Sequence, residues 1–209
     1  MFMVNYILVI TIGYLAGCFQ SSYFITKIFK NTDIRTIGNG NAGASNTVIA
    51  LGWKYGVAVA LLDIGKAIIS IIIIKMFLNT AIVQAQVPYY LYLNGLFVIL
   101  GHNYPFFMGF RGGKGTASLI GMISAIDYRI AIAGILAILF VTLATQYIAL
   151  GTMALVLILV ILTFYFDYSM GCIAIAIVVA LLSIYKHRMN MYNIFHHKEV
   201  KLSDTLGKR

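Results

Sequence analysis

Few residues in this chain carry a charge. Of its 209 residues 10% are charged, whereas a soluble domain usually has about 25%. Hydrophobic residues make up 61%, and the mean hydropathy is +0.93. These values exclude an ordinary soluble protein and predict an all-α integral membrane protein, because helices satisfy their own backbone hydrogen bonds in lipid. Linker-like stretches and internal repeats are also lacking, so we expect a single polytopic domain over residues 1–209.

Acidic residues are much scarcer than basic ones. The chain has 6 aspartates and glutamates against 15 lysines and arginines, which gives a net charge of +9. A basic protein of this kind could bind nucleic acid. The positive residues, however, sit at the ends of apolar segments, which is typical of a membrane protein with a basic inner face. We therefore expect membrane lipid as a partner and no nucleic acid.

Cysteine and clusters of metal ligands are sparse as well. Cys18 and Cys172 lie in apolar segments, as small core residues do, and they say little about the redox compartment. His196 and His197 lack carboxylate or cysteine partners at suitable spacing, so we expect no metal. No charge precedes Lys27, whereas a signal peptide needs positive charge before its apolar run. The first apolar segment is thus expected to be a retained helix with its N-terminus outside.

Seven apolar segments approach or reach the length of about 20 residues that a membrane-spanning helix needs. They lie at 4–25, 55–77, 88–106, 115–127, 130–147, 149–166 and 168–186, and the fourth is short. Seven spans place the 26–54 loop, the 107–114 loop and the C-terminus in the cytoplasm. Only Lys75 and Arg129 then remain on the outer side. This positive-inside bias supports the orientation.

Three polar segments interrupt the apolar chain, and all three fall on the predicted cytoplasmic side. They run from Asp33 to Trp53, from Gly101 to Thr116 and from Lys186 to Glu199. Polar groups are costly in a bilayer, so clusters of this kind at helix ends usually mark a working site. Together they predict an anion-handling site at the cytoplasmic face.

The first two segments are rich in glycine. Residues 38–43 form a turn that exposes many backbone N–H groups, which can hold an anion. A plain membrane-surface loop is the alternative. In residues 111–116 the glycines let the backbone approach a ligand, and Lys114 adds charge. A helix that begins near Gly115 would also point its N-terminus at the loop. Phosphate binding is favoured here over a positive-inside anchor.

The third segment and the second span add titratable residues. His187 and Asn190 are three residues apart, so on a continuing helix they share a face. Histidine can exchange a proton near neutral pH, and asparagine can orient a hydroxyl or carbonyl group. The alternative is an interface histidine. Asp63 and Lys66 are also three apart, and charges within a membrane tend to pair. That pair is either purely structural or positions site residues.

These residues, in this order, resemble the bacterial acyl-phosphate-dependent glycerol-3-phosphate acyltransferase family. The matching pieces extend over nearly the whole chain: Asp33-Ile34-Arg35 before Gly38, Gly40-Asn41, Gly43-Ala44 with Asn46, Leu62-Asp63 with Lys66, Gly101-His102, Phe110 before Gly112-Gly113-Lys114-Gly115, and His187-Arg188 with Asn190 and Glu199. Each piece is weak alone, but the ordered set is specific.

The resemblance implies a seven-helix enzyme of the bacterial cytoplasmic membrane, with its active site facing the cytoplasm and no metal or organic cofactor. It implies transfer of a fatty acyl group from acyl phosphate to the 1-hydroxyl of glycerol 3-phosphate, which gives lysophosphatidic acid in phospholipid synthesis. His187 and Asn190 would position the acceptor or assist its proton transfer. The substrate-binding residues implied are Arg35, Asn39, Asn41, Asn46, Lys66, His102, Gly112, Gly113, Lys114, Gly115 and Arg188.

The chain departs from the family pattern at several positions, where groups that could bind phosphate are lost. Asn39 replaces a serine, Ile49 an arginine, Gln146 an arginine or lysine, Ala149 a serine and Asn193 an arginine. Two alternatives therefore stand: a divergent paralogue that acylates another phosphorylated polyol or lipid, and a non-catalytic lipid-binding or transport protein on the same scaffold. A transporter should show discontinuous helices or repeat symmetry near the membrane midplane, and the sequence indicates neither.

Overall fold

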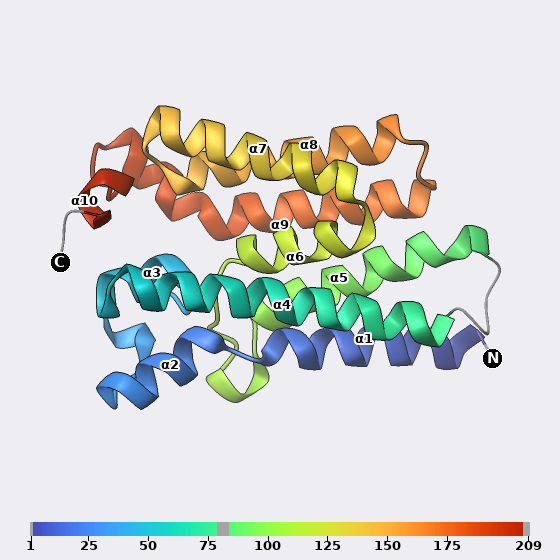
Figure 1. Cartoon of the computed structure of the whole chain (residues 1–209), viewed down its shortest axis with the longest axis horizontal. Helices are drawn as coiled ribbons and strands as arrows, with labels where there is room; N and C mark the ends of the chain where they lie inside the picture. The colour runs from blue at the N-terminus through green and yellow to red at the C-terminus, as the bar shows by residue number, and fades with distance from the viewer. Residues whose placement is uncertain (1, 79–83, 207–209) are drawn as a thin grey trace. The chain divides into compact units, whose positions relative to one another are not determined.

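The computed structural model describes residues 2–78 and 84–206, which fold into α-helices joined by short turns and short 3-10 helices (Figure 1). The chain divides into two compact units, Met1–Ile126 and Asp127–Arg209. We call them the first and the second unit and describe each by itself.

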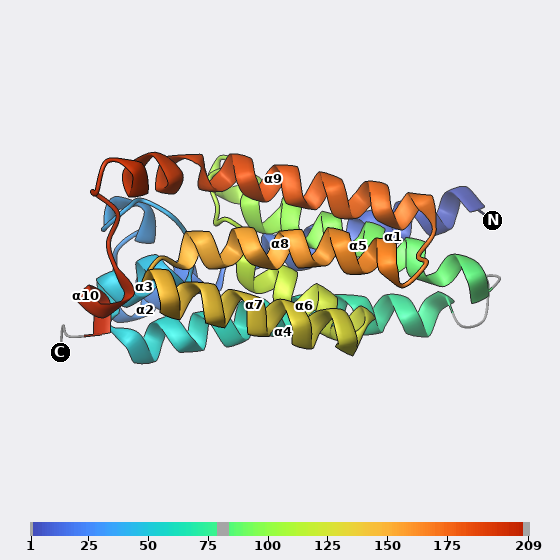
Figure 2. The same cartoon turned by 90° about the horizontal axis from the view of Figure 1, so that it is seen from above.

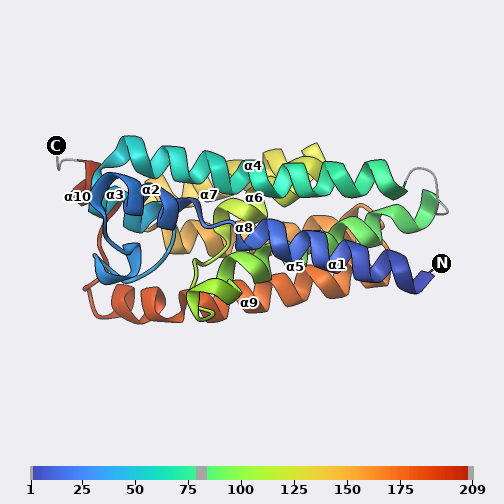
Figure 3. The same ribbon diagram turned by 90° about the horizontal axis from the view of Figure 1, so that it is seen from below.

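The first unit carries two of the three polar segments. Its elements are α1 Phe2–Cys18, α2 Ser21–Lys30, η1 Ile34–Thr36, α3 Ala44–Leu51, α4 Trp53–Leu78, η2 Gln84–Gln86, α5 Val87–Asn103, η3 Phe106–Met108 and α6 Thr116–Ile126. Helix α1 packs along α5, and α4 packs against α3, α5 and α6 (Figure 3). Glycine permits the close approach of α1 and α5, since a Cβ on Gly17 would collide with the backbone of Val98. At the end of this unit that carries η2, a core forms from Val9, Ile71, Ile74, Leu78, Tyr90 and Leu91.

In residues 127–206, the described part of the second unit, there are three long helices and one short one. They are α7 Tyr128–Thr145, α8 Ile148–Tyr165, α9 Met170–Phe195 and α10 Leu202–Leu206. Helix α8 packs against both α7 and α9, and the three run side by side (Figure 2). Asp127 caps α7 by accepting a hydrogen bond from the backbone N–H of Arg129, and Ser169 caps α9 in the same way.

Helix length and composition support a membrane protein. Within residues 2–78 and 84–206, five helical stretches are long and apolar enough to cross a bilayer: Asn5–Lys30, Trp53–Leu78, Tyr128–Thr145, Ile148–Tyr165 and Met170–Phe195. Helix α5 has 17 residues and falls just short of that length. Helix α6 has 11 residues and rises about 16 Å, which is half of a hydrocarbon core about 30 Å thick. The all-helical membrane fold is therefore confirmed, whereas the seven-span topology stays a prediction.

Three helix boundaries differ from those expected from the sequence. The first span is not one continuous helix, because α1 ends at Cys18 and α2 begins at Ser21. The first polar segment is also not only loop, since Ala44–Leu51 forms α3. At the other end of the chain α9 continues to Phe195, nine residues beyond the expected end of the seventh span at residue 186.

Candidate active site

The structure brings the first two polar segments together in the first unit. Arg35 Nη1 donates a hydrogen bond of 2.5 Å to the carbonyl oxygen of Met108. The backbone of Gly113 lies so close to the carbonyl oxygen of Ala42 that a Cβ there would collide with it. A small buried core underlies this contact and consists of Ile34, Ala42, Ala50 and Met108. The two glycine-rich segments thus form one structural region.

Arg35 is held by an ion pair within its own segment. Asp33 Oδ1 accepts a bond from the backbone N–H of Arg35 at 2.9 Å and from Arg35 Nε at 3.0 Å. Asp33 Oδ2 accepts from Arg35 Nη2 at 2.6 Å. These bonds from Arg35 hold the pKa of the Asp33 carboxyl below its usual range. With the bond to Met108, three of the five N–H donors of the guanidinium are used.

Asn46 organises the loop that follows. Its Oδ1 accepts from the backbone N–H of Asn39 at 3.0 Å, and its Nδ2 donates to the carbonyl oxygens of Ile34 and Ile37 at 3.0 and 2.8 Å. Asn46 is buried, whereas Asn39 is exposed and Asn41 half-buried. The loop turns through Gly38, whose φ of 58° favours glycine. The amide of Asn46 therefore shapes the loop, and it does so through hydrogen bonds to the loop backbone.

The glycine loop, residues 109–115, is tied to the end of α5. The N–H of Gly112 donates to the carbonyl oxygen of Asn103 at 3.1 Å, and the N–H of Gly113 donates to that of His102 at 2.9 Å. These two N–H groups therefore serve the loop itself. Lys114 is half-buried, and α6 begins at Thr116, so the expected helix start near Gly115 is confirmed. Lys114 places a positive charge next to the first N–H groups of α6.

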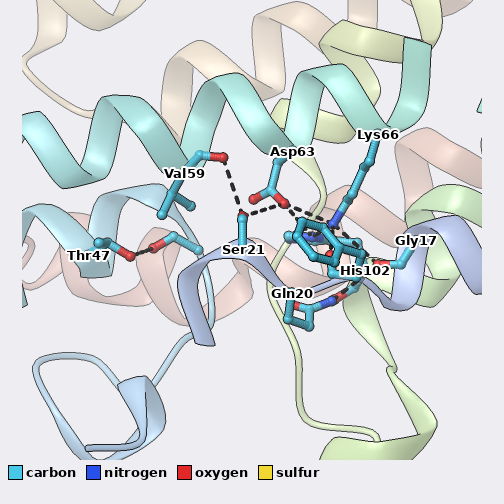
Figure 4. Close-up of polar contacts among 10 residues, drawn as sticks. Gly17, Gln20, Ser21, Thr47, Val59, Asp63, Lys66 and His102 are labelled. Carbon is cyan, nitrogen blue, oxygen red and sulfur yellow. Dashed lines mark hydrogen bonds and ion pairs between the residues drawn. The ribbon is translucent and has the colours of Figure 1, made fainter. Parts of the chain in front are cut away.

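Behind the glycine loop lies a buried polar cluster, which we call the Lys66 cluster: Lys66, Asp63, His102, Ser21 and Gln20 (Figure 4). Lys66 Nζ lies 2.9 Å from Asp63 Oδ1, so the predicted pair is confirmed. The same Nζ lies 2.9 Å from His102 Nδ1. Asp63 Oδ1 also accepts from Ser21 Oγ at 2.8 Å. The cluster joins α2, α4 and α5.

The Lys66 cluster also explains the break between α1 and α2. Lys66 Nζ donates to the carbonyl oxygens of Phe19 and Gly17 at 2.6 and 3.2 Å. Gln20 Nε2 donates to the carbonyl oxygens of His102 and Gly17 at 3.1 and 3.3 Å. Irregular backbone is tolerated at membrane depth where protein groups bond to it, and here side chains do so.

Gln20 and Ser21 were not among the residues expected at the site, and the contact between His102 and Lys66 was not expected either. One signal was present, because Gln20 and Ser21 are polar residues inside an otherwise apolar run. The contact with His102 left no signal, since 36 residues separate it from Lys66 and only the packing of α4 beside α5 brings them together.

The third polar segment lies in the second unit, at the end of α9. His187 and Asn190 are both buried on this helix, as its expected continuation required. His187 Nδ1 lies 2.9 Å from the carbonyl oxygen of Ser183. A carbonyl only accepts, so Nδ1 carries the hydrogen and Nε2 of the neutral ring carries the lone pair. Glu199 accepts from Asn190 Nδ2 at 2.5 Å and fixes its amide.

The neighbouring basic residues behave differently. Arg188 is exposed, donates to the carbonyl oxygen of Tyr185 at 2.8 Å and stacks over that ring at 4.0 Å. Its guanidinium is thus directed along its own helix. His196 is exposed and repeats the bond of His187, with Nδ1 2.8 Å from the carbonyl oxygen of Tyr192. In the part of the chain that the structure describes, no three His, Cys, Asp or Glu side chains form a group that could hold a metal ion.

Comparison with known proteins gives consistent results. The family model described as glycerol-3-phosphate acyltransferase matches residues 7–197. The chain is 43% identical over 205 residues to glycerol-3-phosphate acyltransferase 1 of Oceanobacillus iheyensis, covering 98% of both chains. It is 38% identical over 205 residues to the glycerol-3-phosphate acyltransferase of Shouchella clausii, covering 95% of this chain and 97% of that one.

Two crystal structures of PlsY, described as an integral membrane glycerol 3-phosphate acyltransferase, have the same fold. The glycerol 3-phosphate form gives a TM-score of 0.84 at 32% identity, with 94% of each chain covered. The lysophosphatidic acid form gives 0.82 at 30% identity, with 96% of this chain and 98% of that one covered.

Proposed function

This chain belongs to the glycerol-3-phosphate acyltransferase family, and we propose that it moves a fatty acyl group from acyl phosphate to the 1-hydroxyl of glycerol 3-phosphate. The product is lysophosphatidic acid, for phospholipid synthesis in the membrane. The observation that carries the proposal is the family match over residues 7–197, which includes the named residues of the two glycine-rich segments and of α9. Because the match extends over both units, we treat residues 1–209 as one acyltransferase domain.

The reaction needs no protein nucleophile. The 1-hydroxyl oxygen of glycerol 3-phosphate attacks the carbonyl carbon of acyl phosphate, and a new ester C–O bond forms. The bond between that carbon and the phosphate oxygen breaks, and inorganic phosphate leaves with the proton of the hydroxyl. Acyl phosphate is already an activated donor. Positioning the hydroxyl and stabilising charge on the carbonyl oxygen are the tasks left to the enzyme.

The residues on α9 suit the hydroxyl. His187 Nε2 carries the lone pair that can take the hydroxyl proton and pass it to the departing phosphate. Asn190 orients the same hydroxyl, with its amide held by Glu199. His187 and Asn190 lie about one helical turn apart on α9 and would act on the same substrate hydroxyl.

The residues of the first unit suit the phosphate groups. Lys114 and the N-terminus of α6 offer charge and N–H donors, and Arg35 keeps two of its five N–H donors for a phosphate. Asn39 and Asn41 lie on the loop that Asn46 shapes. Gly112 and Gly113 let the loop backbone pass close to α5, so we assign them a structural role in the loop and no direct contact with phosphate. Arg188 has little support as a binding residue, since it stacks on Tyr185.

The charge distribution supports an orientation in the bacterial cytoplasmic membrane. We place the N-terminus outside and the loops at 26–54 and 107–114 in the cytoplasm, together with the C-terminus. In this arrangement seven segments cross, with α6 as a short fourth one. The phosphate-binding residues and the end of α9 then face the cytoplasm, where glycerol 3-phosphate is dissolved.

An assay of the purified protein tests the activity. It is supplied with palmitoyl phosphate or palmitoyl-CoA and with glycerol 3-phosphate or other phosphorylated polyols. We expect lysophosphatidic acid and inorganic phosphate from palmitoyl phosphate and glycerol 3-phosphate. An ester with another polyol would instead indicate a divergent paralogue, which the replacements at Asn39 and Gln146 favour as the second candidate. Absence of any ester would refute the enzyme assignment.

The same assay tests the role of His187. General acid–base catalysis contributes about 10²–10⁴-fold in rate, so His187→Ala should lower kcat by a factor in that range. The matched control is His196→Ala, because His196 makes the same bond to its own helix and is exposed. Equal activities of the two variants would remove His187 from the reaction.

A further inference from the structure

The contact between Lys66 and His102 determines which ring nitrogen of His102 carries the hydrogen. An ammonium group only donates, so a 2.9 Å contact from Lys66 Nζ requires a lone pair on His102 Nδ1. Asp63 Oδ1 also lies near Nδ1, at 3.7 Å, which is too far for a hydrogen bond. His102 is therefore the Nε2–H tautomer, the opposite of His187.

The other side of the ring faces the glycine loop. A Cβ on Gly113 would collide with His102 Nε2, so this ring edge lies directly against the loop backbone. The carbonyl oxygen of His102 accepts the N–H of Gly113 at 2.9 Å. Both the backbone and the ring of His102 thus contact the loop that carries Lys114.

Lys66 in turn is held in place from several directions. Asp63 is on its own helix α4, and the carbonyl oxygens of Gly17 and Phe19 lie at the break between α1 and α2. His102 therefore abuts a cation whose position is fixed by two other elements. Any substrate contact by Lys66 would require leaving these partners.

We propose that Lys66 and His102 are positioning residues: Lys66 sets the tautomer and orientation of His102, and His102 holds the glycine loop so that Lys114 meets the phosphate of the acceptor. Neither side chain contacts substrate. This inference rests on the proposed function for its last step, but the tautomer and the loop position do not depend on activity.

Nitrogen NMR of protein labelled at its 4 histidines tests the first step. We expect the His102 ring in the Nε2–H form, with its signal assigned by its loss in His102→Gln. The double variant Asp63→Asn with Lys66→Met removes the ion pair without leaving a lone buried charge, and it should change this signal. A His102 found in the Nδ1–H form in the unmodified protein would overturn the proposal.

Kinetics and proteolysis test the second step. In the double variant we expect KM for glycerol 3-phosphate to rise about tenfold, the cost of roughly one lost hydrogen bond, with kcat nearly unchanged. Tryptic cleavage after the exposed Arg111 should become faster. Lys75→Met is the matched control on the same helix and should change neither quantity.

The outcomes separate the inference from the proposed function. An unchanged KM, or a fall in kcat alone, would refute positioning by the Lys66 cluster. If the unmodified protein acylates no glycerol 3-phosphate, the proposed function fails. In that case the tautomer of His102 and the rate of tryptic cleavage after Arg111 still decide whether Lys66 and His102 hold the glycine loop.

Discussion

Each unit contains one Asp-x-Arg segment, Asp33–Arg35 in the first and Asp127–Arg129 in the second. In both, the aspartate binds the backbone N–H and the side chain of the arginine, an arrangement that we call a clasp. Asp33 and Asp127 each accept a bond of 2.9 Å from the backbone N–H two residues later. Each also pairs with the arginine side chain at that position, at 2.6 Å for Arg35 and 2.7 Å for Arg129. The local geometry is thus a general way to begin a helical turn with an ion pair.

The clasps differ in what else they touch. Arg35 uses a further donor on the carbonyl oxygen of Met108 and so ties the clasp to the glycine-rich segment. Arg129 instead lies over the ring of Phe166 at 3.9 Å, while Asp127 accepts from Tyr168 Oη at 2.9 Å. The first clasp organises the proposed site, and the second fastens a turn between helices. A three-residue motif alone does not distinguish these roles.

The largest difference in activity between the two units is expected when Arg35 and Arg129 are replaced in turn. Arg35→Gln should lower kcat/KM for glycerol 3-phosphate by about 10–100-fold, since a hydrogen bond to a charged group is worth roughly 1.5–3 kcal/mol. Arg129→Gln is the matched control and should leave kcat/KM within about twofold, because Arg129 contacts Asp127 and Phe166, which lie outside the proposed site. Similar losses in both variants would mean that the clasps act only through stability, which a melting curve of each variant would show.

A smaller effect is expected where the chain departs from the family pattern. Asn39→Ser in the first unit should raise kcat/KM for glycerol 3-phosphate by about two- to tenfold, the value of one neutral hydrogen bond. Gln146→Arg with Ala149→Ser tests the corresponding change in the second unit, and the triple variant should gain most. The prediction fails if the unmodified protein already uses this acceptor efficiently, because other groups would then replace the missing ones.

The smallest effect concerns pH. Hydrogen bonds from Arg129 lower the pKa of Asp127 from 3.8 to about 2. A carboxyl whose pKa is depressed in the folded state stabilises the protein above pH 3.8 and loses that contribution as the pH falls towards 2. The melting temperature of the unmodified protein in detergent should therefore fall by a few degrees more than that of Asp127→Asn over this range. Parallel curves would contradict the shift. The melting temperature of Asp33→Asn should likewise fall less than that of the unmodified protein over this range, because the pKa of Asp33 is also lowered.

Much of the fold could be read from apolarity and charge. The expected span at 55–77 matches α4 within two residues at each end, because a long apolar run has no other stable form in lipid. The break after Cys18 could not be read, since its backbone is satisfied by Lys66, which lies in a different helix. Helix α3 was hidden by the glycines and asparagines before it, which predict turns.

The site was predictable where chemistry follows local spacing. Asp63 with Lys66, and His187 with Asn190, are three apart and lie on helices as expected. The partners of those residues were not predictable, because they depend on tertiary packing. His102 reaches Lys66 only where α5 meets α4, and Glu199 reaches Asn190 only after the chain turns back beyond α9.

The break between α1 and α2 has a consequence for the biogenesis of the protein. The carbonyl oxygens of Gly17 and Phe19 bond to Lys66, which is synthesised almost 50 residues later. The first segment therefore enters the membrane before its partner exists, and its kink becomes stable only when α4 arrives. A nascent chain stalled before α4 should hold this segment in a different conformation and be a better target for membrane quality control. The side chain that contacts His102 in the finished protein thus also completes the assembly of its first helices.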